Sequence, residues 1–167
     1  MVAFGHTAIG GIIGYYAFAQ LGNGDPVTGL LITGTAGIIS HYIMDTVPHG
    51  HFFRTGYKAK IIPVIIFDLA LSVILYTGAA YYFSNGNILF TLYILFGIGG
   101  SQLPDIFDGL IYTDILPRKG IIKWENNFHT ATHWHGKAKN VLLWSVWDVW
   151  QIGFFFLGLY LLLTPIV

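Results

Sequence analysis

The segment ISHYIMDTVPHGHF, residues 39–52, combines histidines and a carboxylate in a pattern that can bind a metal ion. His41 and Asp45 are four residues apart, so on a helix they share one face and can approach the same cation. His49 and His51 follow within six residues. A capping or interfacial His–Asp hydrogen bond is the alternative interpretation, because the HxxxD spacing also arises by chance.

Two later segments carry side chains of the same kinds. SQLPDIFDG places Asp105 and Asp108 three residues apart on one helical face, with Pro104 expected to open a fresh helical turn and Ser101 as its cap. FHTATHWHG supplies three histidines: His129, His133 and His135. Neutral imidazole is the commonest metal ligand. The alternatives are acids that favour a helix dipole and histidines in a wet interfacial loop.

Polar residues near or inside apolar stretches complete the candidate set. His6 lies close to the N-terminus. Asp68 and Asp148 each lie about eight residues inside an apolar segment, a depth of roughly 12 Å on a helix. An acid within a membrane span is a functional candidate by default. We interpret Asp68 and Asp148 as candidate catalytic residues, acting as a base or as a partner that orients a histidine. A polar contact between helices is the alternative.

The composition indicates a membrane protein. Of the 167 residues, 54% are hydrophobic and 10% are charged, whereas soluble domains carry about 25% charged residues. There is no cysteine, which excludes disulfides, thiolate catalysis and cysteine-based zinc sites. The formal net charge is zero, so nothing indicates nucleic-acid binding. A His and Asp donor set without cysteine suits zinc, manganese or iron, and there are enough ligands for more than one divalent ion.

Apolar runs predict an all-α, single-domain bundle of about five transmembrane helices. The predicted spans are residues 3–21, 27–47, 61–83, 87–112 and 141–166, and the long polar loops are 48–60 and 113–140. In the first span Gly5, Gly10, Gly11 and Gly14 permit close helix packing. All eight basic residues fall in the two polar loops. The positive-inside rule therefore predicts a multi-pass inner-membrane protein with its basic face cytoplasmic and its C-terminus on the opposite side.

This topology brings the ligand-type side chains to one side of the bilayer. All seven histidines lie on or near the basic face. Asp45, Asp105 and Asp108 end spans that reach the same face, so we expect a shared cation pocket there.

Four motifs resemble the YdjM-type bacterial membrane-bound, metal-dependent hydrolases. They are the N-terminal H-x-x-x-G at His6, SHxxxD at His41 and Asp45, LPDxxD at Asp105 and Asp108, and the histidine loop at His129 and His133. In that family the LPDxD segment precedes the histidine loop and SHxxxD comes last, whereas SHYIMD comes first here. The family is thought to be related to zinc-dependent phospholipase C and zinc-dependent single-strand nucleases. The resemblance implies an all-helical hydrolase that holds several zinc ions through these residues.

The leading functional hypothesis is an integral-membrane, metal-dependent hydrolase of a phosphoester, with membrane lipid or a lipid headgroup as the substrate within reach. Two metals would activate water, and Arg54 and Lys123 would meet the phosphate. The alternatives are a metal-ion or proton-coupled transporter, a haem protein with a histidine pair, and a non-catalytic membrane protein with or without a structural metal. The oligomeric state is left open by the sequence.

Overall fold

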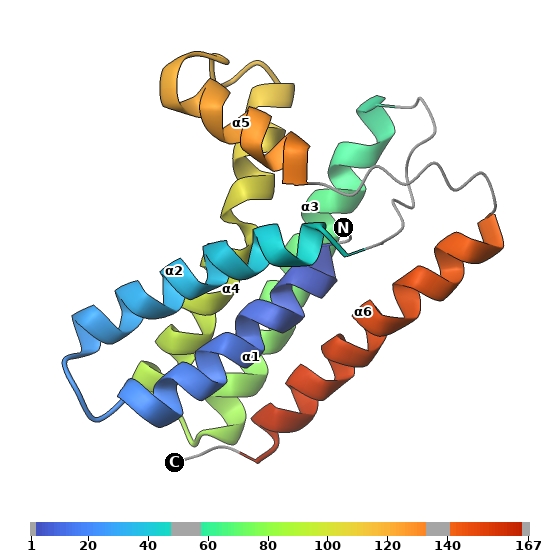
Figure 1. The fold of residues 1–167 in the computed structure, drawn as a ribbon. Coiled ribbons are helices and arrows are strands. Elements are labelled where there is room, and N and C mark those ends of the chain that lie inside the picture. The colour runs from blue at the N-terminus through green and yellow to red at the C-terminus, as the bar shows by residue number, and fades with distance from the viewer. Residues whose placement is uncertain (1–2, 48–57, 133–140, 165–167) are drawn as a thin grey trace.

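The computed structural model describes residues 3–47, 58–132 and 141–164, and in these residues every element is an α-helix (Figure 1). The side chains of residues 3–4, 58–65, 68, 112 and 141–148 are not described. The helices are α1 (Ala3–Leu21), α2 (Pro26–Asp45), α3 (Lys58–Phe83), α4 (Ile88–Tyr112), α5 (Gly120–Thr132) and α6 (Val141–Leu162). The predicted all-α class is confirmed.

Five of these helices coincide with the five predicted apolar segments, with ends that differ by a few residues. The sixth, α5, lies in the connection 113–140, which was predicted to be a polar loop. That expectation was wrong over Gly120–Thr132. The segment GIIKWENNFHTAT is 13 residues long and mixes polar with apolar side chains, so it gives no continuous apolar run.

Side-chain caps define the two short turns within the bundle. Asp25 accepts a hydrogen bond from the Thr28 amide at 2.8 Å, and Pro26 follows at the first helical position of α2. Asn87 caps α4 in the same way, through the Phe90 amide at 2.9 Å. These turns and the end of α6 lie at one end of the bundle, while the start of α1, the end of α2 and α5 lie at the other (Figure 1).

Helix α4 packs against both α1 and α2 at glycine-lined contacts. A Cβ atom on Gly10 of α1 or on Gly37 of α2 would lie 2.5 Å from the same backbone oxygen, that of Gly97 in α4. Only glycine permits three backbones to approach this closely. The predicted role of the first-span glycines is confirmed at Gly10 and at Gly14, whose added Cβ would lie 2.5 Å from the Tyr93 carbonyl oxygen of α4.

Pro104 lies inside α4 and does not start a new helix. The expectation that Ser101 caps a fresh turn was therefore wrong. Ser101 Oγ instead donates to the His6 carbonyl oxygen at 2.8 Å and to that of Ile98 at 2.9 Å. Proline has no N–H, so the helix loses one hydrogen bond, to the Gly100 carbonyl. Helix α4 nevertheless continues through Pro104 to Tyr112.

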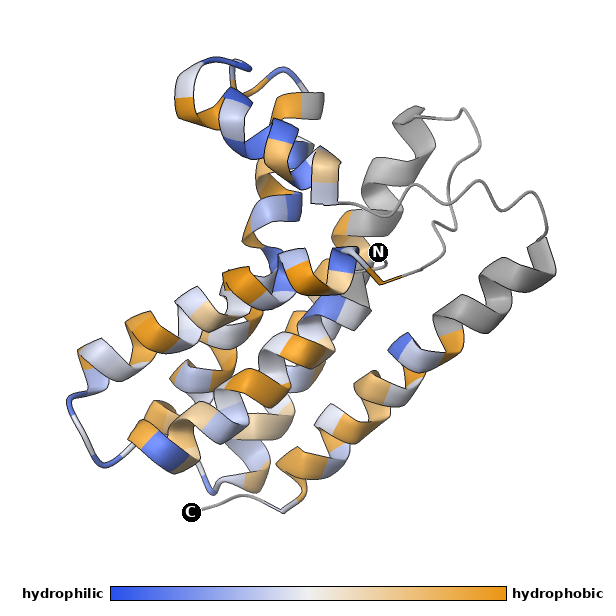
Figure 2. Cartoon of the chain, viewed as in Figure 1, coloured by the Kyte–Doolittle hydropathy of each residue, from blue (hydrophilic) through white to orange (hydrophobic). Residues whose placement is uncertain are grey.

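Among the described residues, two helices are long and apolar enough to cross a membrane: α2 and residues 88–111 of α4. The most apolar window of α2 is only 22% buried in the chain, unlike the core helix of a soluble protein. Hydrophobic residues cover much of the long helices, and hydrophilic ones gather at α5 and at the turns (Figure 2). Exposed apolar surface of this extent needs a partner or a bilayer.

Candidate metal centre

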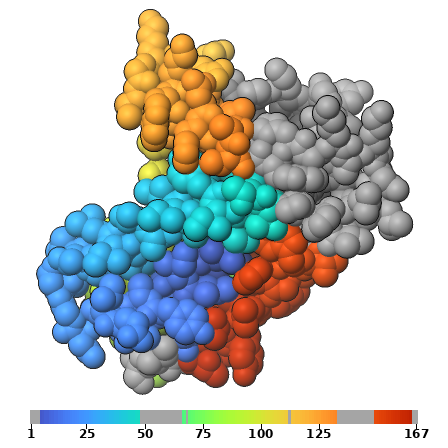
Figure 3. All heavy atoms as spheres, viewed as in Figure 1, coloured from blue at the N-terminus to red at the C-terminus, as the bar shows by residue number. Residues whose placement is uncertain are grey.

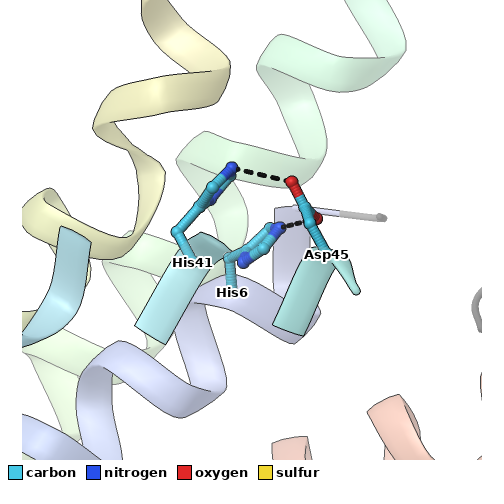
Figure 4. Close-up of side chains that lie close together, drawn as sticks. All are labelled: His6, His41 and Asp45. Carbon is cyan, nitrogen blue, oxygen red and sulfur yellow. Dashed lines mark ion pairs between the residues drawn. The ribbon is translucent and has the colours of Figure 1, made fainter. Parts of the chain in front are cut away.

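Four helices bring six of the predicted residues together at the α5 end of the bundle. They are His6 from α1, His41 and Asp45 from α2, Asp105 and Asp108 from α4, and His129 from α5. The three histidines and Asp45 are buried. Figure 4 shows His6 and His41 both pointing toward the Asp45 carboxylate. Residues up to 123 positions apart in sequence therefore share one site.

The tautomer of His41 is set by a backbone carbonyl near the proline of α4. His41 Nδ1 lies 2.7 Å from the Ser101 carbonyl oxygen. A carbonyl can only accept, so Nδ1 carries the hydrogen and Nε2 of the neutral ring carries a lone pair. Nε2 points into the cluster, toward Asp45 and His129. His41 is thus oriented as a metal ligand, with the second nitrogen held by an outer partner.

Two imidazole nitrogens and two carboxylate oxygens approach one another with the spacing of metal ligands. His41 Nε2 and His129 Nε2 are 3.0 Å apart. Asp45 Oδ2 lies 3.1 Å from the first and 2.8 Å from the second. Asp105 Oδ1 lies 3.8 Å and 3.7 Å from the same two nitrogens. In a tetrahedral site with bonds of about 2.0–2.1 Å, neighbouring donors lie about 3.3–3.4 Å apart, in the middle of the observed range.

The other oxygens of the two carboxylates face His6. Its Nε2 lies 3.3 Å from Asp45 Oδ1 and 3.8 Å from Asp105 Oδ2. The His6 ring also stacks on His41, with centroids 4.0 Å apart and planes inclined by 19°. His6 Nε2 and the second oxygens of the two carboxylates thus form a further group of possible metal ligands beside His41.

Asp108 lies behind His129, not among the atoms that surround the first cation position. Its Oδ2 is 3.0 Å from His129 Nδ1, and its Oδ1 accepts a hydrogen bond from Asn126 Nδ2. The Asp108 carboxylate beside Nδ1 favours the tautomer of a neutral His129 that carries its hydrogen on Nδ1, which leaves Nε2 to bind metal. This carboxylate–histidine pairing orients the ligand and raises its basicity.

The electrostatics of the cluster favour positive charge at His129. Burial lowers the pKa of this histidine, but hydrogen bonds with Asp108 and Asp45 and the charge of Asp105 outweigh burial and raise the pKa to about 10. Carboxylates concentrated around a buried imidazole thus stabilise an added positive charge. The same carboxylates would stabilise a divalent cation bound at this position, with His129 neutral.

The cluster is closed on the helix side and open toward Asp105. The Asp45 side chain is 0% exposed, whereas those of Asp105 and Asp108 are 34% and 32% exposed. The two acidic side chains of α4 therefore form the solvent-exposed side of the cluster. Catalytic metal sites keep one position open in this way, while structural sites are closed by protein ligands.

The remaining predicted site residues cannot be placed in the cluster. His49, His51, Arg54, His133 and His135 lie outside the described residues. Asp68 and Asp148 belong to α3 and α6, but their side chains are not described. Lys123 is exposed on α5. Gln151, from the same segment as Asp148, is buried and faces Gly5 of α1, where an added Cβ would lie 2.7 Å from its Oε1 atom.

The groups that orient the candidate ligands were not predicted from the sequence. The Ser101 carbonyl holds His41, and Asn126 contacts Asp108. Tyr42 donates to Glu125 Oε1 at 2.9 Å and so connects α2 to α5. Asn126 precedes His129 by one helical turn, so a helix at 120–132 would have indicated it. The carbonyl carries no signal in the sequence, because every residue has one.

Comparison with protein-family models, with curated proteins and with solved structures gave no match to this chain.

Proposed function

We propose that this chain is an integral-membrane, metal-dependent hydrolase that cleaves a phosphoester. The observation that carries the proposal is the convergence of three histidine Nε2 atoms on two carboxylates, Asp45 and Asp105, at the end of a helical bundle with an apolar surface. Two groups of these residues have donor atoms within 4.8 Å of one another: His6, His41 and Asp45, and His41, Asp105 and His129.

The residues divide into ligands and supports. His41, His129, Asp45 and Asp105 hold the first cation, and His6 with the second oxygens of Asp45 and Asp105 holds the other. Asp108 and the Ser101 carbonyl fix the two imidazole rings. A divalent cation bound here would activate water as a nucleophile and neutralise charge on a phosphoryl group. The donor set suits zinc, and manganese or iron bind the same ligand types.

The position of the cluster favours a hydrolase over a carrier. His6 is near the start of α1 and Asp45 is the last residue of α2, so the cluster lies at one end of the bundle. Binding sites of secondary transporters lie near the bilayer midplane instead. The 34% exposure of Asp105 favours an open, reactive site over a structural metal.

Elemental analysis of the purified protein tests the metal site. We expect stoichiometric zinc, manganese or iron in the wild type, and loss of that metal in His41→Ala and Asp45→Asn. Asp25→Asn is the matched control, because Asp25 is fully exposed at the opposite end of α2, where it caps the helix. Full metal content in both cluster variants would refute the site.

Hydrolysis assays test the reaction. Protein in mixed micelles is offered an activated phosphodiester and, separately, phospholipids that differ in headgroup. We expect turnover that a chelator abolishes and that the added metal restores. The Asp45→Asn variant should be inactive at every metal concentration. Metal-loaded protein that cleaves no phosphoester, yet carries zinc or manganese into proteoliposomes, would replace the hydrolase by a transporter.

A further inference from the structure

Helix α5 carries an exposed apolar stripe on a face other than the one that carries His129. Its members are Ile121, Trp124 and Phe128, which are 75%, 62% and 41% exposed. Their spacing of three and four residues places them on one face of the helix. His129 on the same helix is 1% exposed and faces the cluster. This 13-residue helix thus carries the candidate metal ligand His129 on one face and an exposed apolar stripe on another.

The stripe continues onto the exposed surface of α2. Trp124 and Phe128 stack with planes 5° apart, and Phe128 packs edge-on against Tyr42 of α2 with ring centroids 4.9 Å apart. The neighbours of Tyr42 on α2, Ile39 and Ile43, are 55% and 59% exposed. Figure 3 shows α5 resting on the C-terminal end of α2. The apolar surface of a candidate membrane span therefore leads directly into the stripe.

Exposed basic residues accompany the stripe. Arg118 and Lys119 precede α5 and Lys123 lies within its first turn, all exposed. Aromatic residues with an apolar face and a polar edge favour the membrane–water interface. Amphipathic helices that combine such a face with Lys and Arg lie in the plane of the headgroups and bind anionic lipid.

We propose that α5 is a membrane-surface helix, with Ile121, Trp124 and Phe128 inserted below the headgroups of an anionic bilayer and Arg118, Lys119 and Lys123 facing the lipid phosphates. The continuity with α2 and the positive charge identify lipid, and not a second copy of this chain, as the occupant. The inference rests on the membrane placement in the proposed function and is independent of its metal and of its chemistry.

The absence of cysteine from the chain permits a direct depth measurement. Ile121→Cys leaves both aromatic residues of the stripe in place and receives a fluorescent label. Thr130→Cys is the matched control with the same label, because Thr130 is exposed on the same helix outside the stripe. Each protein is reconstituted in nanodiscs whose lipids are brominated on the acyl chains. We expect the label at 121 to be quenched severalfold more than the label at 130.

Lipid charge and a charge variant provide the second measurement. Quenching at 121 should be stronger with phosphatidylglycerol than with phosphatidylcholine, and Lys119→Gln with Lys123→Gln should remove that difference. Equal quenching at 121 and 130, or a label at 121 that is shielded only in a dimer, would overturn the proposal. Quenching that does not depend on lipid charge would overturn the role of the basic residues. None of these readouts uses metal or turnover, so a failed hydrolase assay leaves the result intact.

Discussion

Asp108→Asn isolates the contribution of the carboxylate behind His129. The wild-type carboxylate is contacted from two sides: His129 Nδ1 lies 3.0 Å from Oδ2, and Asn126 Nδ2 donates to Oδ1. An amide at position 108 has only one oxygen. If the oxygen faces His129, its NH₂ group meets the NH₂ of Asn126. If it faces Asn126, its NH₂ meets His129 Nδ1 and drives the ring hydrogen onto Nε2, the atom that should bind metal.

Either outcome weakens the metal site without removing a ligand. Loss of an outer partner of a metal-bound histidine costs about 10–100-fold in affinity, or about 1.4–2.7 kcal/mol. We therefore expect Asp108→Asn to weaken metal binding by that factor, while far-UV circular dichroism and the unfolding temperature of the metal-free protein stay close to wild type. The affinity is measured by titration of the metal-free protein against a chromophoric chelator.

The double variant Asp108→Asn with Asn126→Asp tests the geometry itself. The amide oxygen at 108 can then accept from His129 while its NH₂ donates to the new carboxylate at 126, at unchanged net charge. We expect most of the lost affinity to return. Wild-type affinity in Asp108→Asn, or a double variant no better than the single one, would refute this account of the hydrogen-bond chain.

Two further predictions concern helix packing and the second cation. Gly97→Ala should destabilise the bundle by about 1–3 kcal/mol, because the new Cβ meets the Gly10 backbone of α1. Gly99→Ala should leave the stability unchanged or raise it by up to about 1 kcal/mol, because nothing lies within 4 Å of its Cβ. Thermal unfolding in detergent compares the two variants, and equal effects would contradict this account of the helix packing. His6→Ala should lower the metal content by one ion per chain while the ion between His41 and His129 stays bound, and an unchanged content on elemental analysis would rule out the second position.

Much of the fold was predictable from the chain alone. A continuous apolar run of about 20 residues can be recognised without knowing what the helix packs against, so the five long helices were located to within a few residues. Helix α5 was missed because its apolar residues are confined to one stripe and it is short. Pro104 was misread as a helix start, because a proline can open a helix or lie within one, and here it lies inside α4.

The sequence by itself determined which side chains were available for chemistry and at which end of the bundle they would gather. His41 and Asp45 share a face because of the 3.6-residue helical period, and the up-and-down order of the long helices brings other ligands to the same end. The tertiary structure alone decided that Asp105 joins the cluster while Asp108 supports His129, and that His6 stacks on His41. Those choices depend on the angles and distances at which α1, α2, α4 and α5 pack, and glycine contacts such as Gly97 with Gly10 set these distances only once the helices meet.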